Sequence, residues 1–288
     1  MTVYAHQIKE AQQALARADA LFIGAGAGMG VDSGLPDFRG NHGFWNAYPI
    51  ARKLGLSFVD LANPRWFEQD PELAWAFYGH RLQMYRSTEP HEGFYRLLRF
   101  ARRLKGGYFV FTSNVDGHFQ KAGYDKQRIA ECHGSIHHLQ CTTPCTDAIW
   151  HADNVQIDID MERFRAKPPL PVCPNCGKIA RPNILMFNDW QWVEHRTEAQ
   201  ERRMSVWLSE IYKKDLRLVV LEIGAGTAVP TVRRTCEKVA WEAEARLIRI
   251  NPREYSVPSG QIGLACGAKE GLELILPDVL LSSVGGKW

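Results

Sequence analysis

One stretch of the chain decides the fold: Ala20-Leu21-Phe22-Ile23-Gly24-Ala25-Gly26-Ala27-Gly28-Met29-Gly30, a short apolar run that leads directly into a glycine-rich segment. An apolar run without polar alternation is typical of a strand buried on both faces. Glycines after such a strand let the backbone approach a pyrophosphate, and the start of the next helix favours negative charge. The spacing is not the strict G-x-G-x-x-G of dehydrogenases, so a tight structural turn is the alternative interpretation.

Three more apolar runs have the same character, at residues 108–111, 218–223 and 246–250. Long segments with helical periodicity separate these runs, which implies crossover connections between parallel strands. The sequence therefore predicts an α/β fold with a doubly wound, parallel, Rossmann-like sheet. Ligands of such sheets bind beyond the carboxyl ends of the strands, where the glycine-rich segment lies.

Two pairs of cysteines interrupt this pattern, Cys141 with Cys145 and Cys173 with Cys176. Two close pairs separated by a loop supply four thiolates to one tetrahedral zinc ion, and we expect a structural zinc there. His137 and His138 are competing candidates for a metal ligand or for a catalytic group. The predicted domains are a Rossmann-like domain of residues 1–139 and 181–288, a small zinc-binding insert of residues 140–180, and a second, helical insert around residues 41–90.

Composition restricts the partners and the compartment. The 288 residues include 35 basic and 32 acidic side chains, with a net charge of +3 and no run of five like charges, so nucleic acid is not an evident partner. The N-terminal stretch lacks the apolar core of a signal peptide, and no segment reaches transmembrane length. We therefore expect a cytoplasmic protein without a membrane partner, in which cysteine pairs bind metal rather than form disulfides.

Polar side chains follow the predicted strands. Asn114 and Asp116 come after the strand at 108–111, where they can point to one ligand or cap the next helix. His133 precedes Gly134 shortly before the first cysteine pair, and a histidine in such a place is either a hydrogen-bonded structural residue or a general base. Asp37, Phe38 and Arg39 lie in a loop that Gly34 and Pro36 keep from being helical.

These segments together resemble the sirtuin family. Gly26-Ala27-Gly28-Met29 with Gly34-Leu35-Pro36-Asp37-Phe38-Arg39 is similar to the first sirtuin motif, and Asn114-Val115-Asp116-Gly117 is similar to the second. His133-Gly134-Ser135 resembles the catalytic histidine motif, and the four cysteines resemble the zinc module. The resemblance spans roughly residues 21–276, with the motifs in the family's order.

The resemblance implies an NAD-dependent protein deacylase, in which the acyl oxygen of a modified lysine attacks the ribose carbon that bears nicotinamide. The product would be O-acyl-ADP-ribose, and the partner would be an acyl-lysine protein or peptide. His133 would act as general base on a ribose hydroxyl, with Asn114 and Asp116 beside the nicotinamide ribose. The residues implied for NAD are Gly24, Ala25, Gly26, Ala27, Gly28, Asp37, Phe38, Arg39, Ser113, Asn114, Asp116, Gly224, Ala225, Gly226, Asn251 and Gly267.

Acyl specificity is addressed by Tyr78 and Arg81, three residues apart on one face of a predicted helix. The pair resembles the Tyr-x-x-Arg of sirtuins that remove succinyl and malonyl groups, since a hydroxyl and a guanidinium can bind one carboxylate. The alternative interpretation is a core tyrosine with a surface arginine. Phe187 and Asn188 stand in the segment where a substrate peptide adds as a strand.

Several positions depart from the family pattern. Ser113 replaces a glutamine, Gly224-Ala225-Gly226 replaces Gly-Thr-Ser, and Phe187-Asn188-Asp189 replaces Phe-Gly-Glu. These departures keep two alternatives open beside a deacylase. One is a sirtuin-like enzyme that transfers ADP-ribose, removes an unusual modification or hydrolyses NAD, and the other is an NAD-responsive binding protein. A sensor has no evident need for a base such as His133.

Overall fold

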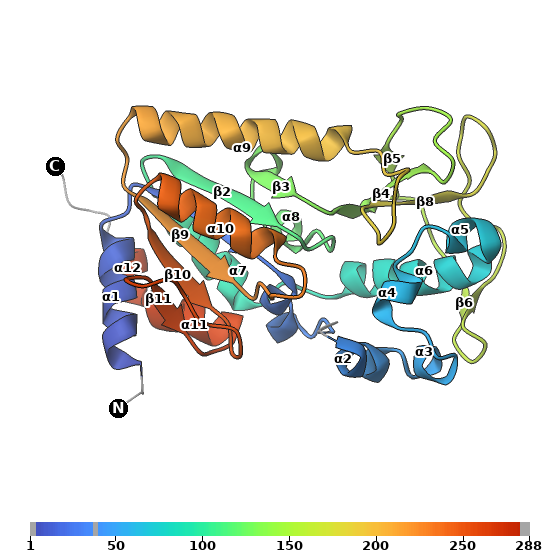
Figure 1. Cartoon of the computed structure of the whole chain (residues 1–288), viewed down its shortest axis with the longest axis horizontal. Helices are drawn as coiled ribbons and strands as arrows, with labels where there is room; N and C mark the ends of the chain where they lie inside the picture. The colour runs from blue at the N-terminus through green and yellow to red at the C-terminus, as the bar shows by residue number, and fades with distance from the viewer. Residues whose placement is uncertain (1–3, 37–39, 283–288) are drawn as a thin grey trace.

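The computed structural model describes residues 4–36 and 40–282, and its centre is a six-stranded parallel sheet (Figure 1). The strands lie in the order β11 (Ile262–Leu264), β10 (Arg246–Ile250), β9 (Leu218–Ile223), β1 (Ala20–Ala25), β2 (Gly107–Thr112) and β3 (Ile129–Glu131). Every pair of neighbours in this sheet is parallel. The predicted doubly wound α/β fold is confirmed.

Helices cover both faces of the sheet because successive strand residues point to opposite sides. Leu21 and Ile23 of β1 pack in one core with α1 (Ala5–Ala16), α7 (Glu92–Ala101) and α11 (Ala268–Ile275). Phe22, between them, packs in a second core with α9 (His195–Lys213) and α10 (Thr231–Glu242). The short α8 (His118–Lys121) and α12 (Asp278–Ser282) pack in the first core, beside α7.

A second group of elements lies beyond the carboxyl end of the sheet. Its helices are α2 (Gly40–Ala47), α3 (Pro49–Lys53), α4 (Phe58–Leu61), α5 (Trp66–Gln69) and α6 (Pro71–Ser87), and its sheet has the order β5 (Trp150–His151), β4 (Gly134–Cys141), β8 (Ala180–Ile184). A two-stranded ribbon, β6 (Ile159–Asp160) with β7 (Arg165–Ala166), packs beside α6.

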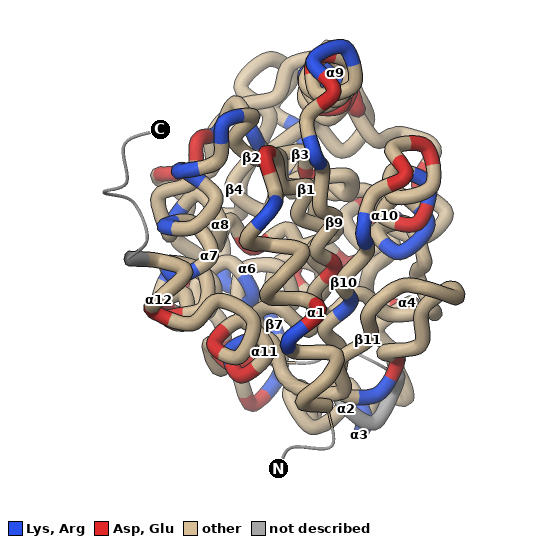
Figure 2. Tube along the Cα trace, turned by 90° about the vertical axis from the view of Figure 1, so that its left-hand side faces the viewer, with Lys and Arg blue, Asp and Glu red and all other residues tan. Residues whose placement is uncertain are grey.

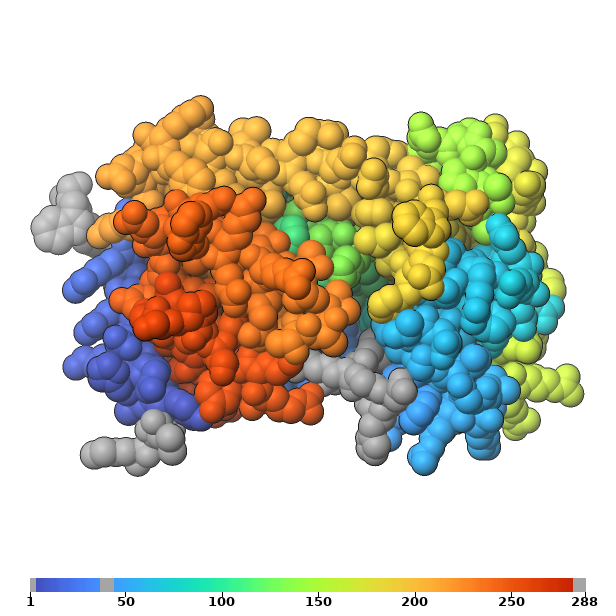
Figure 3. All heavy atoms as spheres, viewed as in Figure 1, coloured from blue at the N-terminus to red at the C-terminus, as the bar shows by residue number. Residues whose placement is uncertain are grey.

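These helices and strands share one apolar core, so the predicted helical insert and the cysteine-bearing insert pack together. Trp75 of α6 is fully buried and donates its indole hydrogen to the carbonyl of Ala180 at 3.0 Å, which ties α6 to β8. Figure 3 shows the atoms of residues 45–87 beside those of 140–180. The exact domain boundaries stay a prediction. Within residues 4–36 and 40–282, no helix is long and apolar enough to cross a bilayer.

Candidate active site

Two glycine-rich loops meet backbone to backbone at the carboxyl ends of β1 and β9. The amide of Gly26 donates to the carbonyl of Ile223 at 3.0 Å, and the amide of Gly28 donates to the carbonyl of Gly224 at 3.0 Å. A Cβ on Gly26 would lie 2.7 Å from the Cα of Ala225. The glycines therefore serve the contact between the loops, and they hold both loops at the edge where ligands of parallel sheets bind.

Strand β1 is two residues longer than the sequence predicts, so Gly24 and Ala25 lie inside it rather than in the loop. A Cβ on Gly24 would lie 2.1 Å from the Sγ of Cys236 on α10, which shows that Gly24 allows this helix to pack closely on the strand. The Ala25 side chain is fully buried, and its carbonyl accepts hydrogen bonds from Thr112 and Ser113. The exposed part of the segment begins at Ala27.

Gly224→Ala is expected to lower the free energy of unfolding by about 1–3 kcal/mol and to raise the KM for NAD. Gly224 has a φ of 64°, and a Cβ there would lie 2.5 Å from the Cα of Gly28, so the two loops must separate. Gly55→Ala is the matched control, since its φ is 68° and no heavy atom lies within 4 Å of its added Cβ. Denaturant unfolding and NAD titration of both variants check the prediction, and equal losses in the two would contradict it.

Two asparagines hold these loops from either side. The side-chain amide of Asn114 donates to the carbonyl of Gly26 at 2.9 Å, and that of fully buried Asn251 donates to the carbonyl of Ala225 at 2.9 Å. The side-chain oxygen of Asn251 also accepts from the amides of Arg253 and Glu254. Both predicted ligand residues, which follow β2 and β10, thus fix carbonyls of the loops that follow β1 and β9.

Asp116 and His133 lie on the segments that follow β2 and β3. Burial raises the pKa of Asp116 above its ordinary value, while neighbouring His118 opposes that shift, and an Asp116 carboxylate oxygen accepts the amide of His118 at 2.9 Å. Burial lowers the pKa of His133 below its ordinary value of 6.5, and a hydrogen bond with the backbone of Ser113 opposes the shift. His133 is therefore a neutral imidazole at pH 7, the form that accepts a proton.

The two neighbouring histidines have other partners. The Nε2 of His137 bonds the carbonyl of Asp116 at 2.8 Å, and a Cβ on Gly117 would lie 2.8 Å from the His137 ring. The His138 ring lies 4.7 Å from the ring of His151. The metal-type cluster found in the described part of the chain contains only cysteines, so neither histidine joins it.

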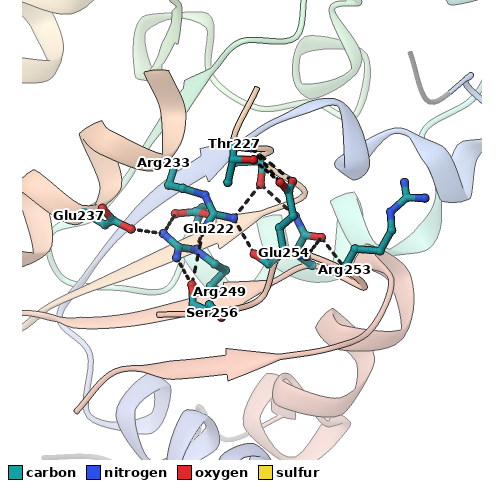
Figure 4. Close-up of polar contacts among 10 residues, drawn as sticks. Glu222, Thr227, Arg233, Glu237, Arg249, Arg253, Glu254 and Ser256 are labelled. Carbon is teal, nitrogen blue, oxygen red and sulfur yellow. Dashed lines mark hydrogen bonds and ion pairs between the residues drawn. The ribbon is translucent and has the colours of Figure 1, made fainter. Parts of the chain in front are cut away.

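A network of charged residues lies next to the glycine-rich loop that follows β9, residues 224–226 (Figure 4). Arg249 of β10 and Glu222 of β9 are buried partners in register, joined by hydrogen bonds of 2.6 and 2.7 Å. Arg249 also donates to Glu237 of α10 at 2.6 Å. The Glu254 carboxylate accepts from the backbone and hydroxyl of Thr227, and so orders the loop that follows Gly226. The sequence does contain a signal for this network, because an acidic residue, Glu222, and a basic residue, Arg249, each interrupt an otherwise apolar predicted strand.

A buried aromatic box surrounds the guanidinium of Arg81. Tyr78 lies in the core, as the alternative interpretation had it, but the surface position that it gave Arg81 is wrong, because this side chain is buried as well. Tyr78 and Arg81 of α6 are 1% and 6% exposed. Arg81 donates to the hydroxyl of Tyr85 from Nε at 3.1 Å and from Nη2 at 2.9 Å. The guanidinium carbon lies 5.2 Å from the Phe77 ring centre and 5.8 Å from that of Phe58. The Tyr78 hydroxyl is buried without a hydrogen-bond partner among the described residues.

Phe58 joins this box to the predicted peptide segment, and sequence reasoning missed it. Its ring lies 6.3 Å from the ring of Phe187, edge to face, and Phe187 is 36% exposed. The Phe187 amide donates to the carbonyl of Ala62 at 2.9 Å. Asn188 is exposed, and its φ of 56° lies in the left-handed region that favours glycine. The backbone at this position therefore has the conformation expected for the glycine of the sirtuin Phe-Gly-Glu segment.

The four predicted cysteines form one cluster. Their Sγ atoms all lie within 4.8 Å of one another, with 3.6 Å between Cys141 and Cys176 and between Cys145 and Cys173. Tetrahedral zinc with bonds of about 2.3 Å places its sulfurs about 3.8 Å apart, so the cluster fits the ion. Cys141 ends β4, and Cys173 and Cys176 precede β8, so the metal would hold the ends of two paired strands together.

The remaining described residues predicted to bind NAD lie in loops or at the start of a helix. Ser113 donates its amide to Ala25, and Gly267 caps α11 beside Asp32, whose carboxylate accepts the amide of Lys269 at 2.7 Å. Ala27 and Gly226 are at least partly exposed on the two loops. Asp37, Phe38 and Arg39 lie outside the described residues.

Comparison with known proteins finds one family. The model described as "Sir2 family" matches residues 26–208. An NAD-dependent protein deacylase of Thermus thermophilus is 30% identical over 278 residues, which cover 94% of each chain. One from Candida albicans is 28% identical and covers 97% of this chain and 98% of its own. The fold matches a crystal structure of a Sir2 homologue in complex with NAD, with a TM-score of 0.70, 24% identity and 94% of each chain covered.

Proposed function

Because this chain belongs to the Sir2 family, we propose that it removes acyl groups from lysine side chains of proteins and consumes NAD in doing so. The observation that carries the proposal is the site itself. Two glycine-rich loops, a neutral, half-buried histidine and an aromatic box with a buried cation lie at the carboxyl end of one parallel sheet. The zinc cluster supplies structure only, since four thiolates leave no open coordination position.

We assign the two loops to the dinucleotide. The backbone amides of Ala27 and Gly226 would face its phosphates, as in other anion-binding loops after parallel strands. Asn114 and Asn251 would set the spacing of the loops through the carbonyls of Gly26 and Ala225, and Gly267 would lie at the start of α11. The departures at Ala225 and Gly226 remove two hydroxyls but leave the amides, which supports retained NAD binding.

His133 would accept the proton of a ribose hydroxyl. An effective general base needs a pKa near or below the working pH, and burial keeps this imidazole neutral. Asp116, fixed by the amide of His118, would hold the ribose and carboxamide region beside it. Asp37 and Arg39 are proposed to line the nicotinamide pocket, with Phe38 shielding the reacting carbon from water.

The aromatic box supports a preference for acidic acyl groups such as succinyl or malonyl. Tyr78 has a buried hydroxyl available for a new acceptor, and Arg81 adds a fixed positive charge beside it. A carboxylate entering this box would be compensated by charge-assisted hydrogen bonds in a low-dielectric site. Phe187 at the mouth would contact the alkyl chain of the modified lysine, next to Phe58.

Nicotinamide release tests both the proposed deacylase activity and the proposed preference for acidic acyl groups. The zinc-loaded protein is expected to release nicotinamide with acyl-lysine peptides and to prefer succinyl-lysine over acetyl-lysine. Arg81→Met is expected to lower the succinyl-to-acetyl ratio of kcat/KM by about 10-fold to 1000-fold, because a buried partner of the carboxylate is lost. Arg163→Met, at a side chain that is 84% exposed, is the control.

The outcomes separate the levels of the proposal. An unchanged ratio in Arg81→Met would reject the acidic-acyl preference and leave the deacylase intact. Nicotinamide release that needs no peptide would favour the alternative of NAD hydrolysis or ADP-ribosyl transfer, to which the exposed side chain of Asn188 lends support because it stands in the peptide segment. NAD binding without any release would favour a sensor.

A further inference from the structure

Two adjoining depressions lie at the amino-terminal end of β2, away from the edge that carries the glycine-rich loops. One, of about 560 Å³, lies between α9 and the single turn at Lys126–Arg128. The other, of about 370 Å³, lies over the start of β2 at Gly106 and Gly107. Asp125 and Arg128 line both, so the depressions form one continuous groove.

The charge of this groove is strongly positive. We call it the basic groove. Its positively charged residues are Arg102, Lys105, Arg128, Arg202 and Arg203, and Asp125 is the one carboxylate that lines it among the residues that the structure describes. Figure 2 looks onto this end of the sheet and shows Lys and Arg segments around β2 and α9, with Asp and Glu segments among them. The described residues that line the groove thus carry an excess of four positive charges, in a chain whose net charge is +3.

Most of these cations are held by carbonyl oxygens, which fix their positions without neutralising them. Arg102 donates to the carbonyl of Gly123 at 2.7 Å, Arg128 to that of Tyr108 at 3.2 Å, and Arg203 to that of Gln127 at 3.3 Å. Two of the five cations also have an ion-pair partner at the surface, where solvent weakens the pairing. Asp125 lies 3.8 Å from Arg128, and Glu198 lies 3.6 Å from exposed Arg202.

The floor of the groove is apolar. The rings of Phe109 and Trp207 lie 5.8 Å apart, and the Trp207 indole donates to the carbonyl of Gly106 at 2.9 Å. Val206 forms the wall from α9 and is 65% exposed. A ligand that fills the groove therefore meets fixed positive charge at the rim and apolar surface at the base.

We propose that the basic groove binds an acidic peptide segment of a partner protein, one that places an apolar side chain among its carboxylates. The rim complements the carboxylates, and the apolar side chain would cover Trp207 and Val206. Nucleic acid fits less well, because single strands stack their bases on exposed aromatic rings and the two rings here pack against each other. The groove lies at the opposite end of the sheet from the candidate active site, so the partner and NAD bind without competing.

The test uses the whole zinc-loaded protein and three fluorescein-labelled probes. One is a short peptide of glutamates around a single phenylalanine, the second has glutamine in place of every glutamate, and the third is an oligothymidine of similar length. Fluorescence anisotropy is expected to show binding of the glutamate peptide that weakens as salt is raised. Lys105→Glu with Arg202→Glu should weaken this binding at least about tenfold, since two rim charges reverse at exposed positions.

Lys9→Glu with Lys238→Glu is the matched control, because it makes the same charge change at exposed positions outside the groove. The proposal expects this variant to bind the glutamate peptide as the unaltered protein does, and both double variants to keep nicotinamide release. Equal binding of the glutamine peptide, tighter binding of oligothymidine, equal losses in both double variants, or no binding of the glutamate peptide would each overturn it. If the unaltered protein bound the glutamate peptide but released no nicotinamide with acyl-lysine peptides, that result would count against the proposed function alone.

Discussion

His133→Ala is expected to lower nicotinamide release by about a hundredfold to ten-thousandfold while NAD still binds. The proposed role of His133 is to accept a proton in the transition state, and general bases contribute to rate on this scale. The side chain lies on the segment between β3 and β4, and NAD binding is assigned to loops that other residues hold. Single-turnover nicotinamide release and NAD titration measure the two effects separately.

The same residue predicts the acid limb of the pH profile. Burial lowers the pKa of His133 below 6.5, so the neutral form that acts as base persists as the pH falls through 6.5 and is lost only at the lower folded-state pKa. The limb of kcat/KM for NAD should therefore have its midpoint below 6.5. His151→Ala, at an exposed histidine, should leave rate and profile unchanged. A midpoint above 6.5, or an active His133→Ala enzyme, would contradict the assignment.

Long apolar runs made the sheet predictable from the sequence. The strands at 20–25, 107–112, 218–223 and 246–250 are buried on both faces, and such strands appear as continuous apolar runs. The edge strands β3 and β11 have three residues each, too few to show a period. Their place follows from pairing with β2 and β10, which the sequence alone does not reveal.

The site was predictable only as a set of residue types. Close spacing along the chain brought Tyr78 and Arg81 together on one helix, but Phe58 approaches from α4, and only tertiary packing places it there. Tyr85 was within reach of sequence reasoning, because a residue four positions after Arg81 shares its helix face. The contact between Gly26 and Ala225 joins loops that are far apart in the sequence, and glycine spacing alone does not show which backbone it admits.

Removal of zinc is expected to unfold the small sheet and abolish deacylation, while the large parallel sheet stays folded. The cysteines lie at the end of β4 and before β8, and the binding free energy of a structural zinc, about 10–16 kcal/mol at neutral pH, exceeds the stability of a small domain. The apolar cores of the six-stranded sheet take no residue from the cysteine loops, so their helices should persist.

Cys173→Ser should reproduce the effect of a chelator, and Cys266→Ser, outside the cluster, should not. Limited proteolysis is expected to cut first within residues 141–180, with far-ultraviolet circular dichroism largely retained. Activity should be lost because β4 begins directly after His133 and β8 directly precedes the segment with Phe187, so both sides of the acyl-lysine site depend on the paired strands. Restored zinc should restore activity in the chelated protein. A metal-free protein that resisted proteolysis but lost activity would instead place the metal in the chemistry, against the closed four-thiolate site.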